Sequence, residues 1–313
     1  MKIAILGATG HISKNIIAGM IRNKKYKLYL FSRTPDRTKS FVDQLGSNYV
    51  VDILSYGDFH NHNYDVVING VGIGNPGSLK QDVSAIFRLT EQFDNLVLDY
   101  LQGSPDTIYI NLSSGAAYGS SFNDPANMDT LAAISINNVS SKDYYSIAKL
   151  HSEAKHRSHP DLHIVDLRVF GFFSKYVDMN ASFFLTELVS SIKSNRVFVT
   201  NRVNIVRDYV HPDDLLQLIE LCIEKRRINT AYDVCSLKPV PKFELLDFFE
   251  KHYDVKYQYT EHNEASVTGM KINYYSQHFN ANEIDYQPRY TSLEGIHQIY
   301  KSIMDEGTVN EED

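Results

Sequence analysis

The chain has few of the features that mark disulfide-rich, membrane-spanning or nucleic-acid-binding proteins. Its 313 residues include only two cysteines, Cys222 and Cys235, which form no C-x-x-C pair and cannot build a disulfide framework. Such usage is typical of a reducing compartment, and we expect a cytoplasmic protein. No apolar run approaches the roughly 18 residues of a membrane span, so no membrane partner is expected. Lys and Arg number 31 against 38 Asp and Glu, a net charge of −7, which lacks the basic footprint that nucleic-acid binding requires.

Short apolar runs typical of buried strands alternate with helix-length segments over the first half of the chain. The strand-like runs cover residues 2–7, 27–32, 48–53, 65–72, 107–114 and 162–170, and the helical segments cover residues 13–23, 36–45, 88–102 and 143–157. This alternation predicts right-handed βαβ units and a parallel sheet that is covered on both faces. After about Gly171 the alternation weakens, although helices are still predicted at 181–194, 212–225, 242–253 and 292–304.

These patterns predict an α/β protein with a Rossmann-type doubly wound parallel sheet and a smaller α/β lobe. We expect residues 1–170 to form an NAD(P)-binding domain, to which segments of 195–235 return, and residues 171–313 to form a substrate-binding lobe. The region 255–290 is rich in tyrosine and has no clear period, so we assign it no regular structure.

A glycine-rich turn, GATGHIS over residues 7–13, follows the first predicted strand and opens the first predicted helix. Glycines let the backbone turn tightly against a pyrophosphate, and the helix N-terminus offers free N–H groups and a positive dipole to that anion. Ser13 stands where a third glycine usually lets the helix approach the strand. We expect a dinucleotide at this turn, with contacts from Gly7, Thr9, Gly10, His11 and Ile12.

The end of the second predicted strand bears on which dinucleotide the turn binds. NAD sites usually carry a carboxylate there, which binds the ribose diol, but this chain reads Ser32-Arg33 and has no acid before Asp36. Arg33 can form a charge-assisted pair with a 2′-phosphate, and Ser32 can donate to it. The pattern favours NADP(H), with NAD(H) as the alternative. Asp52, after the third predicted strand, is placed to reach the adenine amine, with Ile53 beside it.

Two side chains four residues apart on a predicted helix, Tyr145 and Lys149, share a helix face and suggest acid–base chemistry. A free phenol has a pKa near 10 and is a poor base at neutral pH. An ammonium about 4 Å away stabilises a phenolate by about 4 kcal/mol at an effective dielectric near 20, which is roughly three pKa units. Ser113 or Ser114, at the end of the strand 107–114, is placed to hydrogen-bond a substrate oxygen, because ligands of a doubly wound sheet bind at the carboxyl ends of its strands.

Further motifs occur between and after the glycine turn, the two serines and the Tyr145–Lys149 pair. They are Asp65-Val66-Val67-Ile68 before Val71-Gly72, Tyr118-Gly119 after the two serines, Arg207-Asp208-Tyr209-Val210-His211-Pro212-Asp213-Asp214, and a late Pro288 followed by Ser292-Leu293-Glu294-Gly295. Their order resembles the extended short-chain dehydrogenase/reductase family, in its nucleotide-sugar branch of NAD-dependent epimerases and dehydratases. The resemblance runs from Met1 to about Tyr300.

The resemblance implies roles for the catalytic candidates. Counted back from Tyr118-Gly119, the catalytic serine of the family falls on Ser114. Tyr145 then corresponds to the general acid/base, and Lys149 to its electrostatic partner and a ligand of the nicotinamide ribose. Tyr118 and Ser114 are expected to contact the substrate.

Other implied contacts lie outside this cluster. Val71 and Gly72 fall where a small pair lets the cofactor lie against the backbone, and Arg207 matches an arginine that grips the diphosphate of a nucleotide sugar. The resemblance also implies a homodimer, whose seam would use the helix 88–102 and the helix that carries Tyr145.

Two departures from the family pattern bear on the reaction. Gly115 and Ala116 stand where dehydratases of this branch usually carry an Asp-Glu pair, so no acid–base pair for the elimination of water is expected. After Leu167-Arg168 the family often has Asn followed by Gly-Pro, whereas residues 169–171 here read Val-Phe-Gly, and this substrate loop is expected to differ.

These observations predict an oxidoreductase that acts on a nucleotide-activated sugar. A reductase consumes its cofactor and often prefers NADPH, so Ser32-Arg33 favours a keto-sugar reductase. The alternative is a nucleotide-sugar 4-epimerase, which regenerates its cofactor. A third hypothesis, of a different class, is a non-catalytic dinucleotide-binding sensor or assembly protein, although the presence of Ser114, Tyr145 and Lys149 together argues against it.

Four histidines cluster at His151, His156, His159 and His163. No cysteine or carboxylate completes a coordination set with them, so we expect no metal site.

Overall fold

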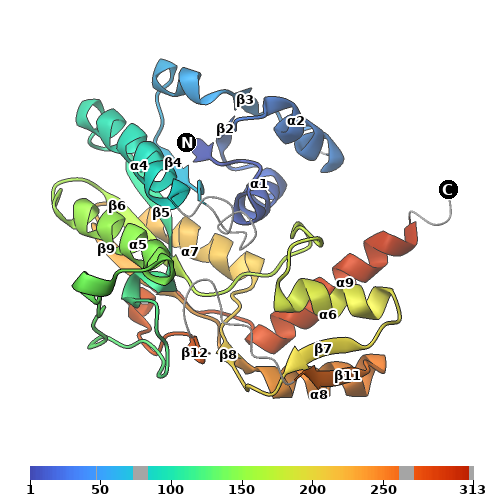
Figure 1. Cartoon of the computed structure of the whole chain (residues 1–313). Helices are drawn as coiled ribbons and strands as arrows, with labels where there is room; N and C mark the ends of the chain where they lie inside the picture. The colour runs from blue at the N-terminus through green and yellow to red at the C-terminus, as the bar shows by residue number, and fades with distance from the viewer. Residues whose placement is uncertain (47, 73–83, 261–270, 310–313) are drawn as a thin grey trace.

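Seven parallel strands form the central sheet of the computed structural model, which describes residues 1–46, 48–72, 84–260 and 271–309. The strands are β1 (Lys2–Leu6), β2 (Lys27–Phe31), β3 (Asp52–Leu54), β4 (Val66–Asn69), β5 (Ile108–Ser114), β6 (Ile164–Val169) and β9 (Thr230–Val234). Their order is β3-β2-β1-β4-β5-β6-β9 (Figure 1). The expected doubly wound sheet is therefore confirmed, and its topological switch point lies between β1 and β4.

Helices cover both faces of this sheet (Figure 1). One face carries α1 (His11–Asn23), α2 (Pro35–Gln44) and α7 (Pro212–Lys225), and the other carries α4 (Ala85–Gly103) and α5 (Ser141–Arg157). Alternate residues of β1 pack against the helices on the two faces. Ile3 and Ile5 lie in the core with α1 and α7, and Ala4 and Leu6 lie in the core with α4. Because both faces are covered, the strands read as continuous apolar runs.

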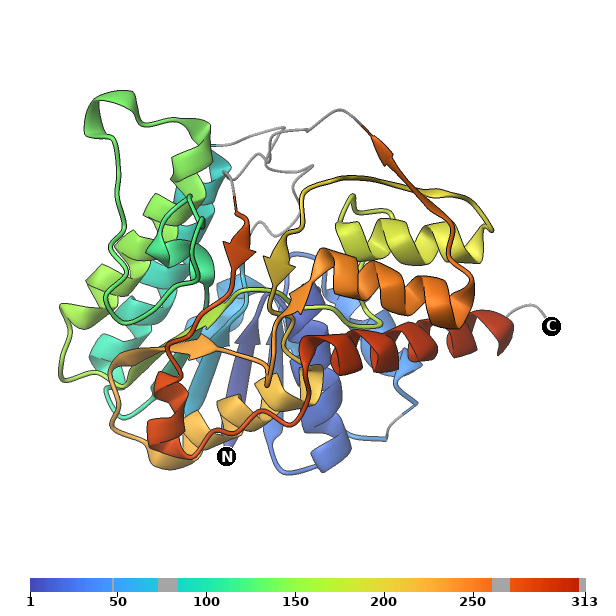
Figure 2. The same cartoon turned by 90° about the horizontal axis from the view of Figure 1, so that it is seen from below.

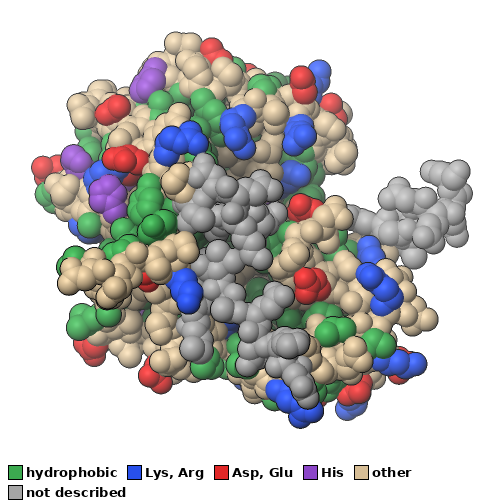
Figure 3. All heavy atoms as spheres, in the orientation of Figure 1, with side chains coloured by type: hydrophobic (Ala, Val, Ile, Leu, Met, Phe, Trp, Pro, Cys, Tyr) green, Lys and Arg blue, Asp and Glu red, His purple; other side chains and the backbone are tan. Residues whose placement is uncertain are grey.

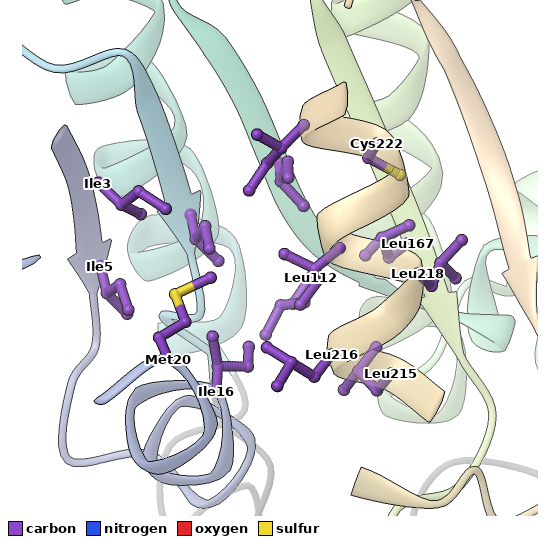
Figure 4. Close-up of a cluster of buried hydrophobic side chains, with 14 of the residues drawn as sticks. Ile3, Ile5, Ile16, Met20, Leu112, Leu167, Leu215, Leu216, Leu218 and Cys222 are labelled. Atoms are coloured by element: carbon purple, nitrogen blue, oxygen red, sulfur yellow. The ribbon is translucent and has the colours of Figure 1, made fainter. Parts of the chain in front are cut away.

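The larger core lies between the sheet and the helices α1 and α7. Figure 4 shows Met20 of α1 and Leu216 and Leu218 of α7 converging on Leu112 of β5. Burying each such side chain stabilises the fold by about 1.5–3 kcal/mol. The contact brings α7 into the first layer although it lies far along the chain, and β9 follows it into the sheet.

A smaller lobe packs beside the sheet and contains two short sheets. The first joins β10 (Val240–Pro241), β8 (Val206–Arg207) and β12 (Asn273–Tyr274), and the second joins β11 (Tyr257–Thr260) to β7 (Phe198–Asn201). Its helices are α6 (Phe184–Lys193), α8 (Lys242–Tyr253) and α9 (Ser292–Val309). Figure 2 shows these three helices gathered to one side of the sheet, around a core of their own.

Two expectations about local structure are wrong. The predicted strand 48–53 starts later, because β3 covers only Asp52–Leu54. The region 255–290, which we left unassigned, contains the strands β11 and β12 and the short 3-10 helix η4 (Asn280–Ile284). These strands are short, and each pairs with a partner distant in sequence, so no local periodicity marks them.

The motif of residues 207–214 joins the two lobes through two buried carboxylates. Asp208 accepts the Ser236 N–H at 3.1 Å and the Ser292 hydroxyl at 3.2 Å. Asp214 accepts the backbone N–H of Arg289 at 3.0 Å and its Nε at 2.9 Å. Hydrogen bonds to ionised groups contribute about 1.5–3 kcal/mol each, so the motif fixes the segment that leads into α9.

The outer surface carries charges of both signs. On the face in Figure 3, Lys and Arg side chains are interspersed with Asp and Glu. None of the helices within the described ranges has the length and hydropathy that a bilayer-spanning segment requires.

A buried ion cluster ties α4 and α5 to the sheet. The His156 ring lies 2.6 Å from Asp94 on one side and 2.9 Å from Asp166 on the other, and it has no exposed surface. Lys155 and Arg157 pair with the same two carboxylates. Burial opposes the charged ring, but hydrogen bonds and the charges of Asp166 and Asp94 outweigh it and raise the pKa of His156 to about 9.

The charge of His156 predicts a loss of stability in alkali. The ring has a pKa near 6.5 when unfolded and about 9 when folded, so its contribution, of about 3 kcal/mol, is complete below pH 6.5 and is lost as the pH rises through 9. In urea titrations between pH 6 and 10, the difference in unfolding free energy between wild type and His156→Gln should therefore shrink. A difference that stays constant over this range would contradict the assignment.

Candidate active site

The glycine turn brings the backbone of β1 against the backbone that follows β4. Gly7 has φ 73°, in the region that favours glycine, and a Cβ there would stand 3.0 Å from backbone atoms of Gly70 and Val71. The Gly10 N–H donates to the Gly7 carbonyl at 2.8 Å. Gly10 is also the N-cap of α1, and no side chain in the described ranges caps that helix. The first N–H groups of α1 therefore face the switch point, where a pyrophosphate can accept them.

Gly70 supplies the close approach that the third position of the turn lacks. Ser13 is buried, and a Cβ added at Gly70 would collide with the Ser13 hydroxyl oxygen. Helix α1 can therefore pack closely on the end of β4, because the residue after the strand is a glycine and leaves room for the Ser13 side chain.

The two residues after Gly70 lie beside the turn, as expected for a cofactor site. The Val71 N–H donates to Asn69 Oδ1 at 3.1 Å, which fixes the chain as it leaves β4. Val71 is half-buried and Gly72 is exposed. A dinucleotide at the glycine turn would pass against this backbone.

His11 is built into the scaffold of the turn. Its Nε2 lies 2.7 Å from the Ser174 hydroxyl, and its ring meets Phe172 edge-on at 5.1 Å. Burial, with a smaller contribution from Lys14, lowers the pKa of His11 to about 4, so the ring is neutral and links the turn to the chain after β6. Of the other predicted contacts, Thr9 is exposed at the turn and Ile12 is half-buried against the core.

Ser32 and Arg33 lie at the expected place after β2, but only one of them is free to meet a phosphate. Ser32 is 1% exposed, and its hydroxyl lies 2.8 Å from the Thr38 hydroxyl in α2. Arg33 is exposed. Of the two, the structure therefore leaves only Arg33 available to a phosphate.

Tyr56 lies beside the glycine turn and was not expected there. Its hydroxyl accepts the Gly7 N–H at 3.1 Å, and its ring lies 4.5 Å from that of Phe93. Burial raises the pKa of Tyr56, although the Gly7 N–H and Arg33 oppose the rise. Tyr56 thus contacts the first glycine of the turn and lies near Arg33, the residue that we expected to pair with a 2′-phosphate.

The structure does not bring Asp52 to this edge. Asp52 begins β3 and pairs in register with Tyr29, two positions before the strand ends. At about 3.3 Å per residue, it lies well below the carboxyl edge. Its carboxylate is 3.1 Å from the Lys27 ammonium, and Ile53 turns toward the core under α1. Residue 52 was placed at the edge because the predicted strand began too early.

Tyr145 and Lys149 share one face of α5, and Lys149 anchors that face to the end of β5. The Lys149 ammonium is buried and donates to the Leu112 carbonyl at 3.0 Å. It lies 6.0 Å from the centroid of the Tyr145 ring. Ser114 is the last residue of β5 and is 6% exposed. The structure therefore gathers phenol, ammonium and hydroxyl at the carboxyl edge, where a doubly wound sheet binds its ligands.

The two serines at the end of β5 face different surroundings. Ser113 donates to Glu153 at 2.6 Å, and Glu153 is held by the Arg168 guanidinium, whose Nη2 lies 2.6 Å away. The Ser114 hydroxyl instead lies 3.0 Å from the hydroxyl of Tyr274. The phenol of Tyr145 acts electrostatically on Tyr274, so Ser114 shares a neighbour with Tyr145, whereas the Ser113 hydroxyl is engaged by Glu153.

Tyr118 lies with the network of Ser113 rather than with Ser114. Its hydroxyl donates to Asp233 at 2.9 Å, and the Arg168 guanidinium lies 4.6 Å from its ring centroid. The expected contact of Tyr118 with a substrate would have to come from the ring and not from the hydroxyl.

Arg207 and a second cation, Lys271, flank one ring. Their charged groups lie 5.9 and 4.3 Å from the centroid of Tyr274. Burial, with the charge of Arg207, lowers the pKa of Lys271 to about 8, and burial also lowers the pKa of Arg207. No carboxylate in the part of the chain that the structure describes pairs with either cation. Two half-buried cations without a carboxylate partner among the described residues form a candidate site for an anion.

The two departures from the family pattern, at Gly115 and at residues 169–171, have one structural cause, which is the packing of Phe170 against Gly115. A Cβ added at Gly115 would collide with the Phe170 ring. Phe170 therefore fills the space that an acidic side chain after Ser114 would need, and the short turn η2 (Gly115–Tyr118) is lined by Gly115 and Ala116. The structure leaves no room for an acidic side chain at residue 115.

The cluster of histidines between residues 151 and 163 shows no metal site. His156 belongs to the buried ion cluster. Among the described residues, no three His, Cys, Asp or Glu side chains are arranged to hold a metal ion.

Comparisons with known proteins agree with this geometry. The model of the NAD dependent epimerase/dehydratase family matches residues 3–235. No curated protein has significant sequence similarity to the chain.

Solved structures share the fold over nearly the whole chain. The UDP-glucose 4-epimerase of Thermotoga maritima with UDP-glucose superposes with a TM-score of 0.79 at 16% identity, over 98% of this chain and 100% of that one. The UDP-glucuronic acid 4-epimerase of Bacillus cereus, with UDP-glucuronic acid and NAD, gives 0.76 at 15% identity over 98% and 100%. The dTDP-glucose 4,6-dehydratase of Bacillus anthracis with NAD gives 0.75 at 18% identity over 98% of each chain. At such identities the likeness shows a common fold.

The contact between Ser13 and Gly70 predicts a paired effect on stability. Gly70→Ala should lower the unfolding free energy by about 1–3 kcal/mol, because the added methyl overlaps the Ser13 hydroxyl. Ser13→Gly in the same chain should restore most of the loss. Thermal and urea unfolding of the two single variants and the double variant measure this, and a double variant no more stable than Gly70→Ala would show that the contact is not the cause.

Proposed function

The chain belongs to the NAD-dependent epimerase/dehydratase family, and we propose that this enzyme epimerises a nucleotide-activated sugar with a bound nicotinamide dinucleotide. The observation that carries the proposal is the gathering of Ser114, Tyr145 and Lys149 at the carboxyl edge of the sheet, between the glycine turn and the cation pair.

The dinucleotide would lie with its pyrophosphate at Gly7, Gly10 and the start of α1, and its backbone contacts would come from Val71 and Gly72. This placement agrees with the left-handed turn at Gly7 and with its close approach to the backbone of Gly70 and Val71. When bound, the cofactor supplies reversible hydride transfer at one sugar carbon. The remaining chemistry is a proton transfer at the oxygen of that carbon, which is the work of the side chains.

Tyr145 is proposed to take the proton from the sugar hydroxyl and to return it after the sugar has turned. Lys149 lies on the same helix face, 6.0 Å from the centroid of the Tyr145 ring, and is held there by the Leu112 carbonyl, so its positive charge would stabilise negative charge that develops at the reacting oxygens. Ser114 donates a hydrogen bond to the same oxygen. The buried position of Ser114 and Lys149 strengthens both interactions, because water does not screen them.

The diphosphate of the substrate is proposed to lie at Arg207 and Lys271. Both cations are half-buried and neither has a carboxylate partner among the residues described, so an anion of two phosphates suits the site. The neighbours with UDP-glucose and UDP-glucuronic acid support a uridine diphosphate sugar as the first candidate.

The structure of the cofactor site and the structural neighbours favour the epimerase over the keto-sugar reductase expected from the sequence. That expectation depended on Ser32 and Arg33 as readers of a 2′-phosphate, and Ser32 is engaged with Thr38. The neighbours include several 4-epimerases, and those that carry a cofactor in their descriptions carry NAD. We therefore propose NAD(H) in place of NADP(H). Dehydration is disfavoured because Phe170 occupies the space behind Gly115.

Two further expectations remain proposals. A homodimer would use α4 and α5, which lie side by side on one face of the sheet (Figure 1). The hypothesis of a non-catalytic sensor is disfavoured because the side chains required for proton transfer are all present at one edge.

The proposed reaction predicts conversion of a UDP sugar into its C4 epimer. We expect the wild type, supplied with NAD, to interconvert at least one pair among UDP-glucose, UDP-glucuronic acid, UDP-N-acetylglucosamine and their C4 epimers, as followed by chromatography. Tyr145→Phe should lower kcat by about 10²–10⁴-fold, whereas the adjacent Tyr144→Phe, which packs on Phe87, should keep wild-type turnover. Oxidation of NADPH by a keto sugar without any epimer formed would support the reductase instead.

The lowered pKa of Lys271 predicts that affinity for UDP depends on pH. The ammonium is charged below a pKa of about 8 and neutral above it, so binding should weaken as the pH rises from 7.5 to 9.5. A bound diphosphate raises that pKa and moves the midpoint above 8. Calorimetric titration with UDP should show that Lys271→Arg removes this dependence and Lys271→Met binds weakly throughout. Identical pH curves for wild type and Lys271→Arg would contradict the role.

A further inference from the structure

The Ser114 hydroxyl is contacted by two groups of the protein. The Ala116 N–H donates to Ser114 Oγ at 3.2 Å, across the first turn of η2. The Tyr274 hydroxyl lies 3.0 Å from the same oxygen. Tyr274 comes from β12 in the smaller lobe, 160 residues further along the chain.

A serine hydroxyl has one hydrogen to donate and two lone pairs that accept. Ala116 uses one of the lone pairs. If Tyr274 donates, the second lone pair is also used, and the Ser114 hydrogen must point away from both partners. If Ser114 donates to Tyr274 instead, its hydrogen is spent inside the protein. The direction of this one bond therefore decides what Ser114 offers to a substrate.

The surroundings of Tyr274 favour donation to Ser114. Burial, and then the nearby Tyr145 hydroxyl, raise the pKa of Tyr274, so the phenol keeps its proton. Within the described ranges the Tyr274 hydroxyl has no acceptor other than Ser114. A phenol is a much stronger acid than an aliphatic alcohol, so it is the better donor of the two.

The ring of Tyr274 is held rigidly enough to impose this direction. Tyr274 is 7% exposed and meets Phe122 edge-on at 4.8 Å and Phe170 at 5.2 Å. Phe170 in turn occupies the space that Gly115 leaves open. The cationic groups of Lys271 and Arg207 lie against the same ring. Packed rings and a fixed strand leave the hydroxyl one position, beside Ser114.

We propose that Tyr274 is a positioning residue, whose hydroxyl donates to Ser114 and thereby turns the Ser114 hydrogen toward the oxygen of the substrate. The inference rests on the proposed function, because it concerns the same Ser114. It adds a residue of the smaller lobe to the groups that take part in proton transfer. It also gives the departures at Gly115 and Phe170 one function, because together they hold the Tyr274 ring in place.

The consequence lies in the negative charge that develops on the substrate oxygen. When Tyr145 removes the hydroxyl proton, that oxygen gains charge, and a donor that is already aimed at it stabilises the transition state more than one that must first reorient. Removing the Tyr274 hydroxyl frees a lone pair on Ser114 and lets its hydrogen turn elsewhere. The effect should fall on kcat and leave binding of the nucleotide sugar nearly unchanged.

A double-mutant cycle on the UDP sugar that the wild type converts best tests this coupling. Tyr274→Phe keeps the ring and should lower kcat about tenfold with KM changed less than about twofold. Ser114→Ala should lower kcat further, and Tyr274→Phe should have no additional effect in the Ser114→Ala background, because Tyr274 acts through Ser114. Equal effects of Tyr274→Phe in both backgrounds, or an unchanged kcat, would overturn the proposal.

Tyr286→Phe is the matched control. Tyr286 is also buried, and its hydroxyl donates to the Cys235 carbonyl at 3.0 Å, with no hydrogen bond in the described ranges to Ser114, Tyr145 or Lys149. It should lower the unfolding temperature by an amount similar to Tyr274→Phe and leave kcat unchanged. A fall in kcat in both variants would show that the loss of a buried hydroxyl, and not the position of Ser114, slows the enzyme.

Neutron diffraction from a deuterated crystal of the wild type separates this proposal from the proposed function. The deuterium of Tyr274 should lie on the line to Ser114 Oγ, and that of Ser114 should point away from Tyr274 and Ala116. A Ser114 deuterium directed at the Tyr274 oxygen would overturn the inference whatever the substrate is. If instead the deuterium positions are as stated but no nucleotide sugar is converted, the proposed function is wrong and the hydroxyl geometry still holds.

Discussion

The hydrogen bond from the Lys149 ammonium to the Leu112 carbonyl fixes the site, because it joins α5 to the last residues of strand β5 at 3.0 Å. A buried ammonium must keep a partner, since an unpaired charge in the interior costs several kcal/mol. Lys149 therefore cannot leave this carbonyl for bulk water, and α5 cannot rotate without breaking the bond. Tyr145, one turn earlier on the same face, is presented at the carboxyl edge as a result. The buried cluster of His156, Asp94 and Asp166 holds the other end of α5 in place.

The smaller lobe completes the edge that the sheet begins. Strands β8 and β12 pair in parallel, and this pairing places Arg207 beside Tyr274, with Lys271 two positions before the strand. The two cations and the phenol then lie over Ser114 from above the sheet. Gly115, Phe170 and Tyr274 form a chain of contacts in which each residue needs the others, since the glycine admits one ring and that ring holds the next. This explains why acids suited to dehydration are missing at the same place.

Local patterns predicted the parts of the site that one segment can encode. The glycine turn follows a strand and opens a helix, and Tyr145 and Lys149 share a face because they are four residues apart, so both could be predicted from spacing. Asp52 was misplaced because strand boundaries depend on pairing with β2, which apolar composition does not report. Lys271 and Tyr274 lie in a region without a period, and their role comes from a register between strands more than sixty residues apart. The expectation of a reductase depended on Ser32 as a phosphate ligand. Its hydroxyl is instead hydrogen-bonded to the Thr38 hydroxyl, and this contact could not be predicted from the position of Ser32 in the sequence.

A crystal structure of the enzyme with NAD and UDP-glucose, or with the UDP sugar that it converts best, would show whether the three sites are occupied together. We expect the dinucleotide pyrophosphate at the start of α1, the substrate diphosphate between Arg207 and Lys271, and one sugar hydroxyl within hydrogen-bond distance of both Tyr145 and Ser114. A sugar nucleotide bound away from the two cations, or a sugar whose hydroxyls all lie beyond reach of Tyr145, would contradict this expectation.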